Sequence, residues 1–167
     1  MAKQFFLTIL LFAFTTTFVN GQSNPFAKGP ASHSQWKLSS KKISDCEYDL
    51  IFTVTLDKGW HTYSIVKIKG AELEVFPTNI VLKSNKEYTL VGDLTETKPV
   101  AEYDKTIKKT VLLHYNKVVF TQRVKLNSGN NVKISGTYQN QVCNDVCETP
   151  PYEEFDFNLQ GTLTCKK

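Results

Sequence analysis

Apolar and polar side chains alternate along much of the chain with the period of two that is typical of half-buried β-strands. The alternation is clearest over residues 48–56 and 118–126, and the first of these segments ends at Asp57-Lys58-Gly59, which predicts a turn. Shorter β-branched and aromatic runs predict further strands at 65–68, 73–76, 80–83, 88–91, 111–115, 132–138 and 155–159.

Clusters of Asn, Gly, Ser and Pro separate these segments, and no segment keeps the 3.6-residue period of a helix. Short strands at this spacing, joined by turns, are typical of antiparallel β-sandwiches. We therefore expect an all-β domain built from two packed antiparallel sheets.

The N-terminus has the pattern of a secretory signal, because Lys3 precedes an apolar run at 5–14 and small residues near Gly21. The run of about ten residues is too short to span a bilayer as a helix. We expect a signal peptide at 1–21, cleaved after Gly21, with an uncleaved anchor as the alternative. Residues 22–35 are expected to form a flexible lead-in and 36–167 the folded domain, in the periplasm or otherwise exported.

Charge gives no sign of a nucleic-acid partner. The formal net charge is +4, and residues of both signs are interspersed along the chain. Lys41-Lys42 and Lys108-Lys109 are short basic pairs of the kind found on solvated edges and loops. A nucleic-acid-binding surface usually has a basic stripe, which is missing from this sequence.

Four cysteines, Cys46, Cys143, Cys147 and Cys165, predict disulfides in an exported chain, with three possible connectivities. Loop-closure entropy assigns about 5 kcal/mol to a Cys46–Cys165 bridge but only about 2 kcal/mol to the small Cys143–Cys147 ring. We therefore expect the long pair to be a structural disulfide and the short pair to be chemically active. The short pair follows the predicted strand at 132–138, and Pro150-Pro151 interrupts the chain before the next strand.

Spacing alone leaves the Cys143–Cys147 pair open to a redox, a static or a metal-binding role. It is not a thioredoxin motif, because that motif has two intervening residues and lies at a helix N-terminus. Asp145 and Glu148 would disfavour a thiolate if they lay close to it. The only possible nitrogen ligands are His33, His61 and His114, none spaced locally with the cysteines, and His114 is expected to pack in its strand. We expect no bound metal and no cofactor, because phosphate-binding and nucleophile-elbow motifs are also missing.

Several motifs resemble a known family over about residues 36–159. They are Gly59-Trp60-His61-Thr62-Tyr63-Ser64, Tyr88-Thr89-Leu90-Val91-Gly92, Phe120-Thr121-Gln122-Arg123-Val124, and Tyr138-Gln139 followed by Cys143-Asn144-Asp145-Val146-Cys147 and Pro150-Pro151. The chain resembles the N-terminal periplasmic domain of the thiol:disulfide interchange protein DsbD. The resemblance implies an immunoglobulin-like β-sandwich that exchanges electrons with thioredoxin-like periplasmic proteins.

The resemblance also implies roles for individual residues. Cys147 would be the sulfur that partners attack, and Cys143 would resolve the mixed disulfide. His61 and Tyr63 match positions that line the site, and Glu102-Tyr103-Asp104 matches a cap loop that shields it.

The chain departs from the family pattern in three ways. Its cysteines are closer together, Glu148-Thr149 separates them from the prolines, and Thr106-Ile107 stands where a cap Phe is expected. Because the chain ends at Lys167 without membrane helices, we expect a separate membrane-linked thiol reductant to serve it. We also expect the protein to be a monomer. The alternative is a non-enzymatic immunoglobulin-like binding module with structural disulfides and an adhesive surface around Trp60 and Tyr63.

Overall fold

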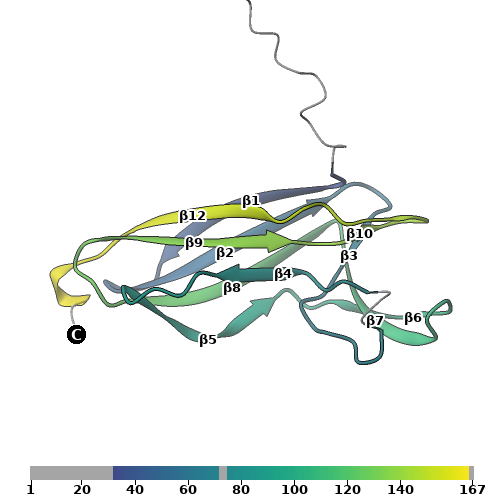
Figure 1. The fold of residues 1–167 in the computed structure, drawn as a ribbon, viewed down its shortest axis with the longest axis horizontal. Coiled ribbons are helices and arrows are strands. Elements are labelled where there is room, and N and C mark those ends of the chain that lie inside the picture. The colour runs from purple at the N-terminus through teal and green to yellow at the C-terminus, as the bar shows by residue number, and fades with distance from the viewer. Residues whose placement is uncertain (1–31, 72–74, 166–167) are drawn as a thin grey trace, which may run out of the picture. The chain divides into compact units, whose positions relative to one another are not determined.

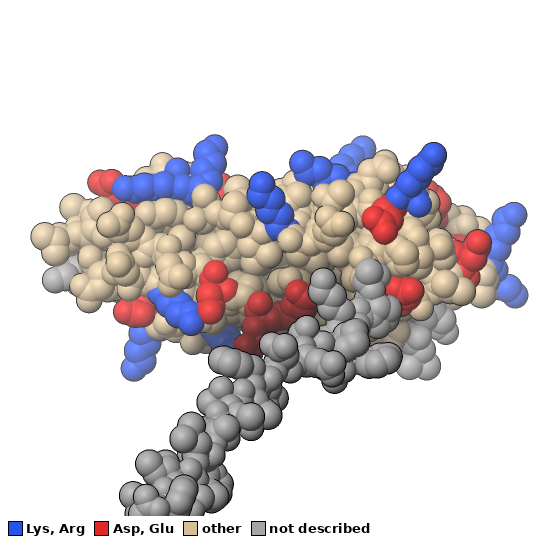
Figure 2. Space-filling view, turned by 90° about the horizontal axis from the view of Figure 1, so that it is seen from above, with Lys and Arg blue, Asp and Glu red and all other residues tan. Residues whose placement is uncertain are grey.

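The computed structural model describes residues 32–71 and 75–165. The predicted signal peptide at 1–21 and the lead-in at 22–31 lie outside the described residues. Within the described part of the chain, no helix is long and apolar enough to cross a membrane. The face shown in Figure 2 carries Lys and Arg side chains interspersed with Asp and Glu.

One layer of the fold is a four-stranded antiparallel sheet in the order β1-β2-β8-β5. Its strands are β1 (Ser34–Lys42), β2 (Glu47–Leu56), β8 (Lys117–Leu126) and β5 (Tyr88–Glu96). The predicted alternation is confirmed, since Leu50, Phe52 and Val54 are all buried while their neighbours are more exposed. Phe52 pairs in register with Phe120 of β8, so the apolar faces of the two longest strands coincide.

A three-stranded antiparallel sheet packs against this layer (Figure 1). Its order is β12-β9-β4, with bounds β12 (Glu153–Gln160), β9 (Asn131–Gln139) and β4 (Asn79–Leu82). Phe52 meets Phe155 and Phe157 edge-on across the core, with ring centroids 5.0 and 5.5 Å apart. Burying each such side chain contributes about 1.5–3 kcal/mol. The all-β, immunoglobulin-like antiparallel sandwich is therefore confirmed.

A third antiparallel sheet lies at the end of the sandwich away from the C-terminal turn (Figure 1). Its order is β11-β10-β3-β7-β6, with bounds β11 (Cys147–Glu148), β10 (Val142–Cys143), β3 (His61–Tyr63), β7 (Lys109–Tyr115) and β6 (Val100–Asp104). This sheet contains Cys143 and Cys147. Cys46 and Cys165 lie elsewhere, in a disulfide with a Cα–Cα distance of 5.3 Å that joins the β1–β2 loop to the 3₁₀ turn η1 (Leu163–Cys165).

The structure corrects several predicted boundaries. The lead-in does not extend to residue 35, because β1 begins at Ser34, whose hydroxyl is buried and donates to Asn140 Oδ1 at 3.3 Å. The predicted strand at 65–68 is absent, since the Ile65 amide instead donates to the Glu96 carboxylate and a turn follows. The predicted strand at 73–76 falls partly outside the described residues, and 75–76 are not in a strand.

Candidate functional site

The Cys143–Cys147 segment forms a small β-hairpin whose two cysteines lie directly opposite each other and are disulfide-bonded. Their Cα atoms are 4.1 Å apart. The turn between them is closed by Asn144, whose side-chain oxygen accepts from the Val146 amide at 2.9 Å and whose own amide donates to the Val146 carbonyl at 3.0 Å. A four-residue sequence separation can therefore hold the two sulfurs together without any helix.

The two cysteines differ sharply in exposure. Cys143 is 1% exposed, whereas Cys147 is exposed in the edge strand β11. Val146 beside it is 63% exposed. An incoming thiolate must reach a sulfur to exchange with it, so Cys147 is the accessible member of the pair.

His61 and Tyr115 continue the row of side chains that the cysteines begin. Cys143 pairs in register with His61 of β3, and His61 pairs with Tyr115 of β7. Directly opposed residues in antiparallel strands share a face of the sheet, so these side chains lie on the same side. His61 packs against Tyr63 and Tyr115, with centroid distances of 5.8 and 5.6 Å, and the Tyr115 hydroxyl donates to Glu102 Oε1 at 2.9 Å.

An apolar cluster covers Cys143 on this face. Its buried members are Tyr63, Ala71, Val75, Val111, Leu113 and Cys143, with Ile68 and Ile107 packed against them. The sheet supplies Tyr63, Val111 and Leu113, while the β3–β4 loop and the β6–β7 turn supply the others. Lys109 ties these two covering segments together, because its Nζ donates to the Lys69 carbonyl at 2.9 Å.

The predicted cap residues lie in β6, but they do not all face the cysteines. Glu102 pairs with Val111 of the apolar cluster, so it lies on the cysteine face. Asp104 shares that face, and its Oδ1 accepts from the Thr106 and Ile107 amides at 2.7 and 3.2 Å. Tyr103 alternates to the opposite face and is 62% exposed. Ile107, at the end of the turn, is the residue that reaches the cluster with Cys143.

Burial favours the neutral forms of His61, Tyr63 and Tyr115. It lowers the pKa of His61, while Glu102 and Asp104 act in the opposite direction. Burial, together with Asp104, raises the pKa of Tyr63. The pKa of Tyr115 is raised to about 12 by burial and by its hydrogen bond to Glu102.

Two polar residues that the sequence analysis did not select hold the cysteine hairpin in place. Asn140 and Gln141 are buried just before β10. The Asn140 amide donates to Thr62 Oγ1 at 3.2 Å, and its Oδ1 accepts from Trp36 Nε1 at 3.1 Å. Gln141 donates to Thr149 Oγ1 at 3.3 Å, and its carbonyl accepts from Thr62 Oγ1 at 2.7 Å. The signal was available in the sequence: two amide side chains interrupt the strand pattern just before the first cysteine.

Glu96 is a second residue that sequence reasoning missed. Its carboxylate lies 2.9 Å from His114 Nε2 and accepts hydrogen bonds from the Ser64 hydroxyl and, at 3.1 Å, from the Ile65 amide. His114 is buried in this contact, so it packs within its strand as expected. Glu96 therefore fixes the first residues of the β3–β4 loop that covers Cys143.

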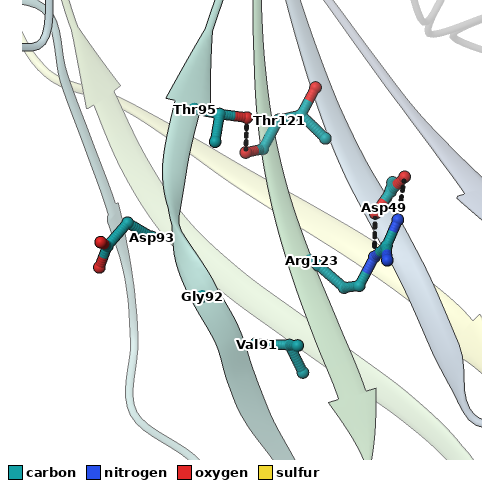
Figure 3. A pocket seen from close by; sticks show the side chains of 7 residues that line it. All are labelled: Asp49, Val91, Gly92, Asp93, Thr95, Thr121 and Arg123. Atoms are coloured by element: carbon teal, nitrogen blue, oxygen red, sulfur yellow. Dashed lines mark hydrogen bonds and ion pairs between the residues drawn. The ribbon is translucent and has the colours of Figure 1, made fainter.

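A hollow of about 310 Å³ on the four-stranded sheet has no connection with the cysteines (Figure 3). Its lining consists of Asp49, Val91, Gly92, Asp93, Thr95, Thr121 and Arg123. Arg123 turns toward Asp49 and donates to both of its carboxylate oxygens, at 2.8 and 3.2 Å. The guanidinium is therefore already paired. Within residues 32–71 and 75–165, no group of three or more His, Cys, Asp or Glu side chains could hold a metal ion.

Comparison with solved structures finds a similar fold in other proteins. The N-terminal periplasmic domain of ScsB from Proteus mirabilis is 21% identical with a TM-score of 0.50, and the match covers 77% of this chain and 46% of that one. The reduced N-terminal domain of DsbD from Neisseria meningitidis is 15% identical with a TM-score of 0.42, covering 75% and 85% of the two chains. The complex of the DsbD and PilB N-terminal domains from Neisseria meningitidis is 16% identical with a TM-score of 0.47, covering 78% and 87%.

The chain thus spans about half the length of the ScsB chain that it matches. No curated protein sequence matches it. The family model described as "Thiol:disulfide interchange protein DsbD, N-terminal" matches residues 31–159, which include both cysteines of the hairpin and all the residues that surround them. The chain therefore belongs to the family of DsbD N-terminal domains.

Proposed function

We propose that this protein is a thiol:disulfide interchange domain that passes electrons through Cys143 and Cys147. The observation that carries the proposal is the unequal exposure of the two cysteines, with residue Cys147 exposed and residue Cys143 buried beneath an apolar cover. Family membership supports the same chemistry. A purely structural disulfide would gain little from having one half presented at an open sheet edge.

In the proposed reaction, the reduced domain uses Cys147 as its nucleophile. The Cys147 thiolate attacks a disulfide in the partner, forming a mixed disulfide and releasing the partner's other sulfur as a thiolate. Cys143 then loses its proton and attacks Cys147 Sγ, which restores the Cys143–Cys147 bond and releases the partner's second thiolate. Two electrons pass from the domain to the partner, and the reverse sequence reloads the domain from a donor dithiol.

The surrounding residues would restrict this exchange to docked partners. Ile107 and the apolar cluster keep Cys143 from solvent, while His61 and Tyr63 form the floor beside it. Glu102 and Asp104 place negative charge on the same face, beside His61 and Tyr63. We assign these two carboxylates to the cap, and Tyr103 to its exposed outer side, where a partner can contact it.

We propose thioredoxin-like proteins as the exchange partners and a separate membrane-linked thiol reductant as the electron donor. The net activity is then reduction of protein disulfides outside the cytoplasm, by a monomer. Membership of the DsbD N-terminal family supports both the partner class and the periplasmic location. They also agree with the signal-like pattern at residues 1–21.

Trapping of the mixed disulfide tests this function. A Cys143→Ala variant keeps the exposed Cys147, so it should accumulate a covalent complex with a thioredoxin-like protein that a reductant dissolves. The matched Cys147→Ala variant keeps only the buried sulfur and should trap at least about tenfold less. Equal trapping by both variants, or by neither, would contradict the assignment of Cys147 as the exchanging sulfur.

The binding-module alternative loses the surface on which it depended. Tyr63 is 6% exposed, so it cannot act as an adhesive residue. Trp60 is half-buried and stacks on His33, with ring centroids 3.6 Å apart. The exposed apolar side chain closest in sequence to the cysteines is instead Val146, inside the cysteine hairpin itself.

A further inference from the structure

Cys143 lies in a setting that opposes its own ionisation, although the second step of the proposed exchange requires its thiolate. The residue is 1% exposed and packs with Tyr63, Val111 and Leu113. Burial in apolar surroundings raises a thiol pKa. A neighbouring group that accepts the proton would remove this obstacle.

His61 is the residue best placed to accept that proton. It lies directly opposite Cys143 across the β3–β10 ladder, on the same face of the sheet. Such opposed residues have Cβ atoms about 4.5–5.5 Å apart, which brings an imidazole within reach of the neighbouring side chain. Cys147 occupies the other flank of Cys143, so the resolving sulfur lies between the sulfur it attacks and the imidazole.

The other ionisable groups on this face are already engaged or protonated. Glu102 accepts the Tyr115 hydroxyl, and Asp104 accepts two amides of its own turn. The pKa of Tyr63 and that of Tyr115 are both raised, so neither phenol is ionised near neutral pH.

A cationic side chain on the same face, Lys109, is also engaged. Its Nζ donates to the Lys69 carbonyl. Among the described residues of this face, His61 is therefore the ionisable side chain whose ring nitrogens make no hydrogen bond to another side chain. One of these nitrogens could hold a proton.

We propose that His61 is the proton acceptor for Cys143 in the resolving step. The proton moves from Cys143 Sγ to an imidazole nitrogen of His61 while Cys143 attacks Cys147 Sγ. The Cys147–partner bond breaks, the partner leaves as a thiolate, and the imidazolium returns its proton to that thiolate or to water. In the reverse direction, the imidazolium protonates Cys143 as it leaves.

The surroundings of His61 suit both protonation states. Because burial lowers its pKa, the ring is neutral and able to accept a proton near neutral pH. Once it is protonated, Glu102 and Asp104 offset part of the desolvation cost of the positive charge. Tyr63 and Tyr115 pack against the ring and hold it in the row that contains Cys143.

This inference rests on the proposed function, and a two-step assay separates the two. Reduced protein is mixed with one equivalent of an aromatic disulfide whose thiolate is coloured. The first release of colour reports attack by Cys147, and the second reports resolution by Cys143. We expect His61→Phe and His61→Gln to slow the second step relative to the first by about 10²-fold, the lower range for loss of a general base.

The pH profile distinguishes proton transfer from simple misplacement of the ring. In wild-type protein the resolution rate should level off above the pKa of His61, whereas in both variants it should keep rising with hydroxide until the thiol itself ionises. His33→Phe is the matched control, because it alters a histidine outside this row and should change neither step.

The outcomes are unambiguous. If wild-type protein gives no first release of colour, the proposed function fails, whatever His61 does. If the first step occurs and resolution is equally fast with an unchanged pH profile in His61→Phe and His61→Gln, the role of His61 is overturned. Unchanged near-ultraviolet circular dichroism in the two variants establishes that the site is still folded.

Discussion

The two disulfides of this protein lie at opposite ends of the sandwich and differ in the length of chain that they close (Figure 1). Cys46–Cys165 has a sequence separation of 119 and joins the β1–β2 loop to the last described turn. Cys143–Cys147 has a separation of 4 and joins two strands that are already neighbours in a hairpin. The first bond therefore constrains the unfolded chain strongly, whereas the second constrains it little.

The surroundings of the two disulfides also differ. Cys165 is buried at the edge of the main core, and its sulfur lies 3.4 Å from the Asp45 carbonyl and 3.3 Å from Thr162 Oγ1. Cys147 is exposed, and its partner Cys143 lies in a separate small cluster with ionisable neighbours. In the proposed function, the same kind of covalent bond would thus be structural at one end and reactive at the other, depending on loop size and on which cysteine is exposed.

Removing the long disulfide should have the largest effect on stability. A Cys46→Ala/Cys165→Ala variant should lose about 5 kcal/mol of unfolding free energy, because its unfolded chain regains the entropy of a very long loop. A Cys143→Ala/Cys147→Ala variant should lose only about 2 kcal/mol. Urea unfolding of both variants measures the difference. A greater loss in the second variant would reverse the division of roles.

The two bonds should also separate on a redox titration. The small ring should be the more readily reduced bond, because Cys147 is exposed whereas Cys165 is buried, and exposed disulfides exchange more readily. Equilibration in glutathione buffers, followed by alkylation and mass spectrometry, should show modified Cys143 and Cys147 while Cys46 and Cys165 remain bonded. Simultaneous reduction of all four cysteines would contradict this.

The sequence predicted strands best where the alternation of apolar residues alone determined their bounds. Alternation of apolar residues predicted β2 and β8 with nearly their observed bounds, since both strands bury one face in the main core. It missed β1, whose outer half carries Ser39 to Lys42 along an exposed sheet edge. It also missed β3, because three residues are too few to show a period.

The residues of the candidate site could be predicted from the sequence only in part. Cys143 and Cys147 could be predicted from their chemistry and spacing, and His61 and Tyr63 from the resemblance of their segment to a family motif. Glu96 acts through its contacts with His114 and the Ile65 amide, and Tyr115 through its contacts with Glu102 and His61, and a linear pattern does not encode these contacts. The face on which Tyr103 lies was likewise set by the register of β6 on β7.

Trimming the apolar cluster over Cys143 should make this cysteine more reactive and so increase the difference between the two ends of the sandwich. Ile107→Ala removes part of the side chain that packs on the cluster around Cys143, and should cost about 1 kcal/mol because the residue is only half-buried. In reduced protein, alkylation of Cys143 should become several-fold faster. The matched Ile80→Ala variant trims a half-buried side chain on the main core and should leave alkylation unchanged. Equal rates in both variants would mean that Ile107 shields nothing.

The smallest effect concerns the Tyr115–Glu102 hydrogen bond, and it depends on pH. The pKa of Tyr115 is about 12 in the folded protein against 10.0 for an unperturbed tyrosine. A group whose pKa is raised by folding adds stability that is fully present below the unfolded pKa and is lost as pH rises through the folded one. The advantage of wild-type protein over Tyr115→Phe should therefore be about 1 kcal/mol near neutral pH and should shrink between pH 10 and 12.

Tyr48→Phe is the control at the end with Cys46 and Cys165, because the Tyr48 hydroxyl donates to the Gln160 carbonyl, which cannot titrate. Urea unfolding of wild type, Tyr115→Phe and Tyr48→Phe across this pH range gives the comparison. If the Tyr115→Phe difference stays constant between pH 8 and 12, Glu102 does not hold the phenol in its protonated form. Stability at the end of the sandwich with Cys143 and Cys147 would then not depend on ionisation of Tyr115. In this respect it would not differ from the end with Cys46 and Cys165.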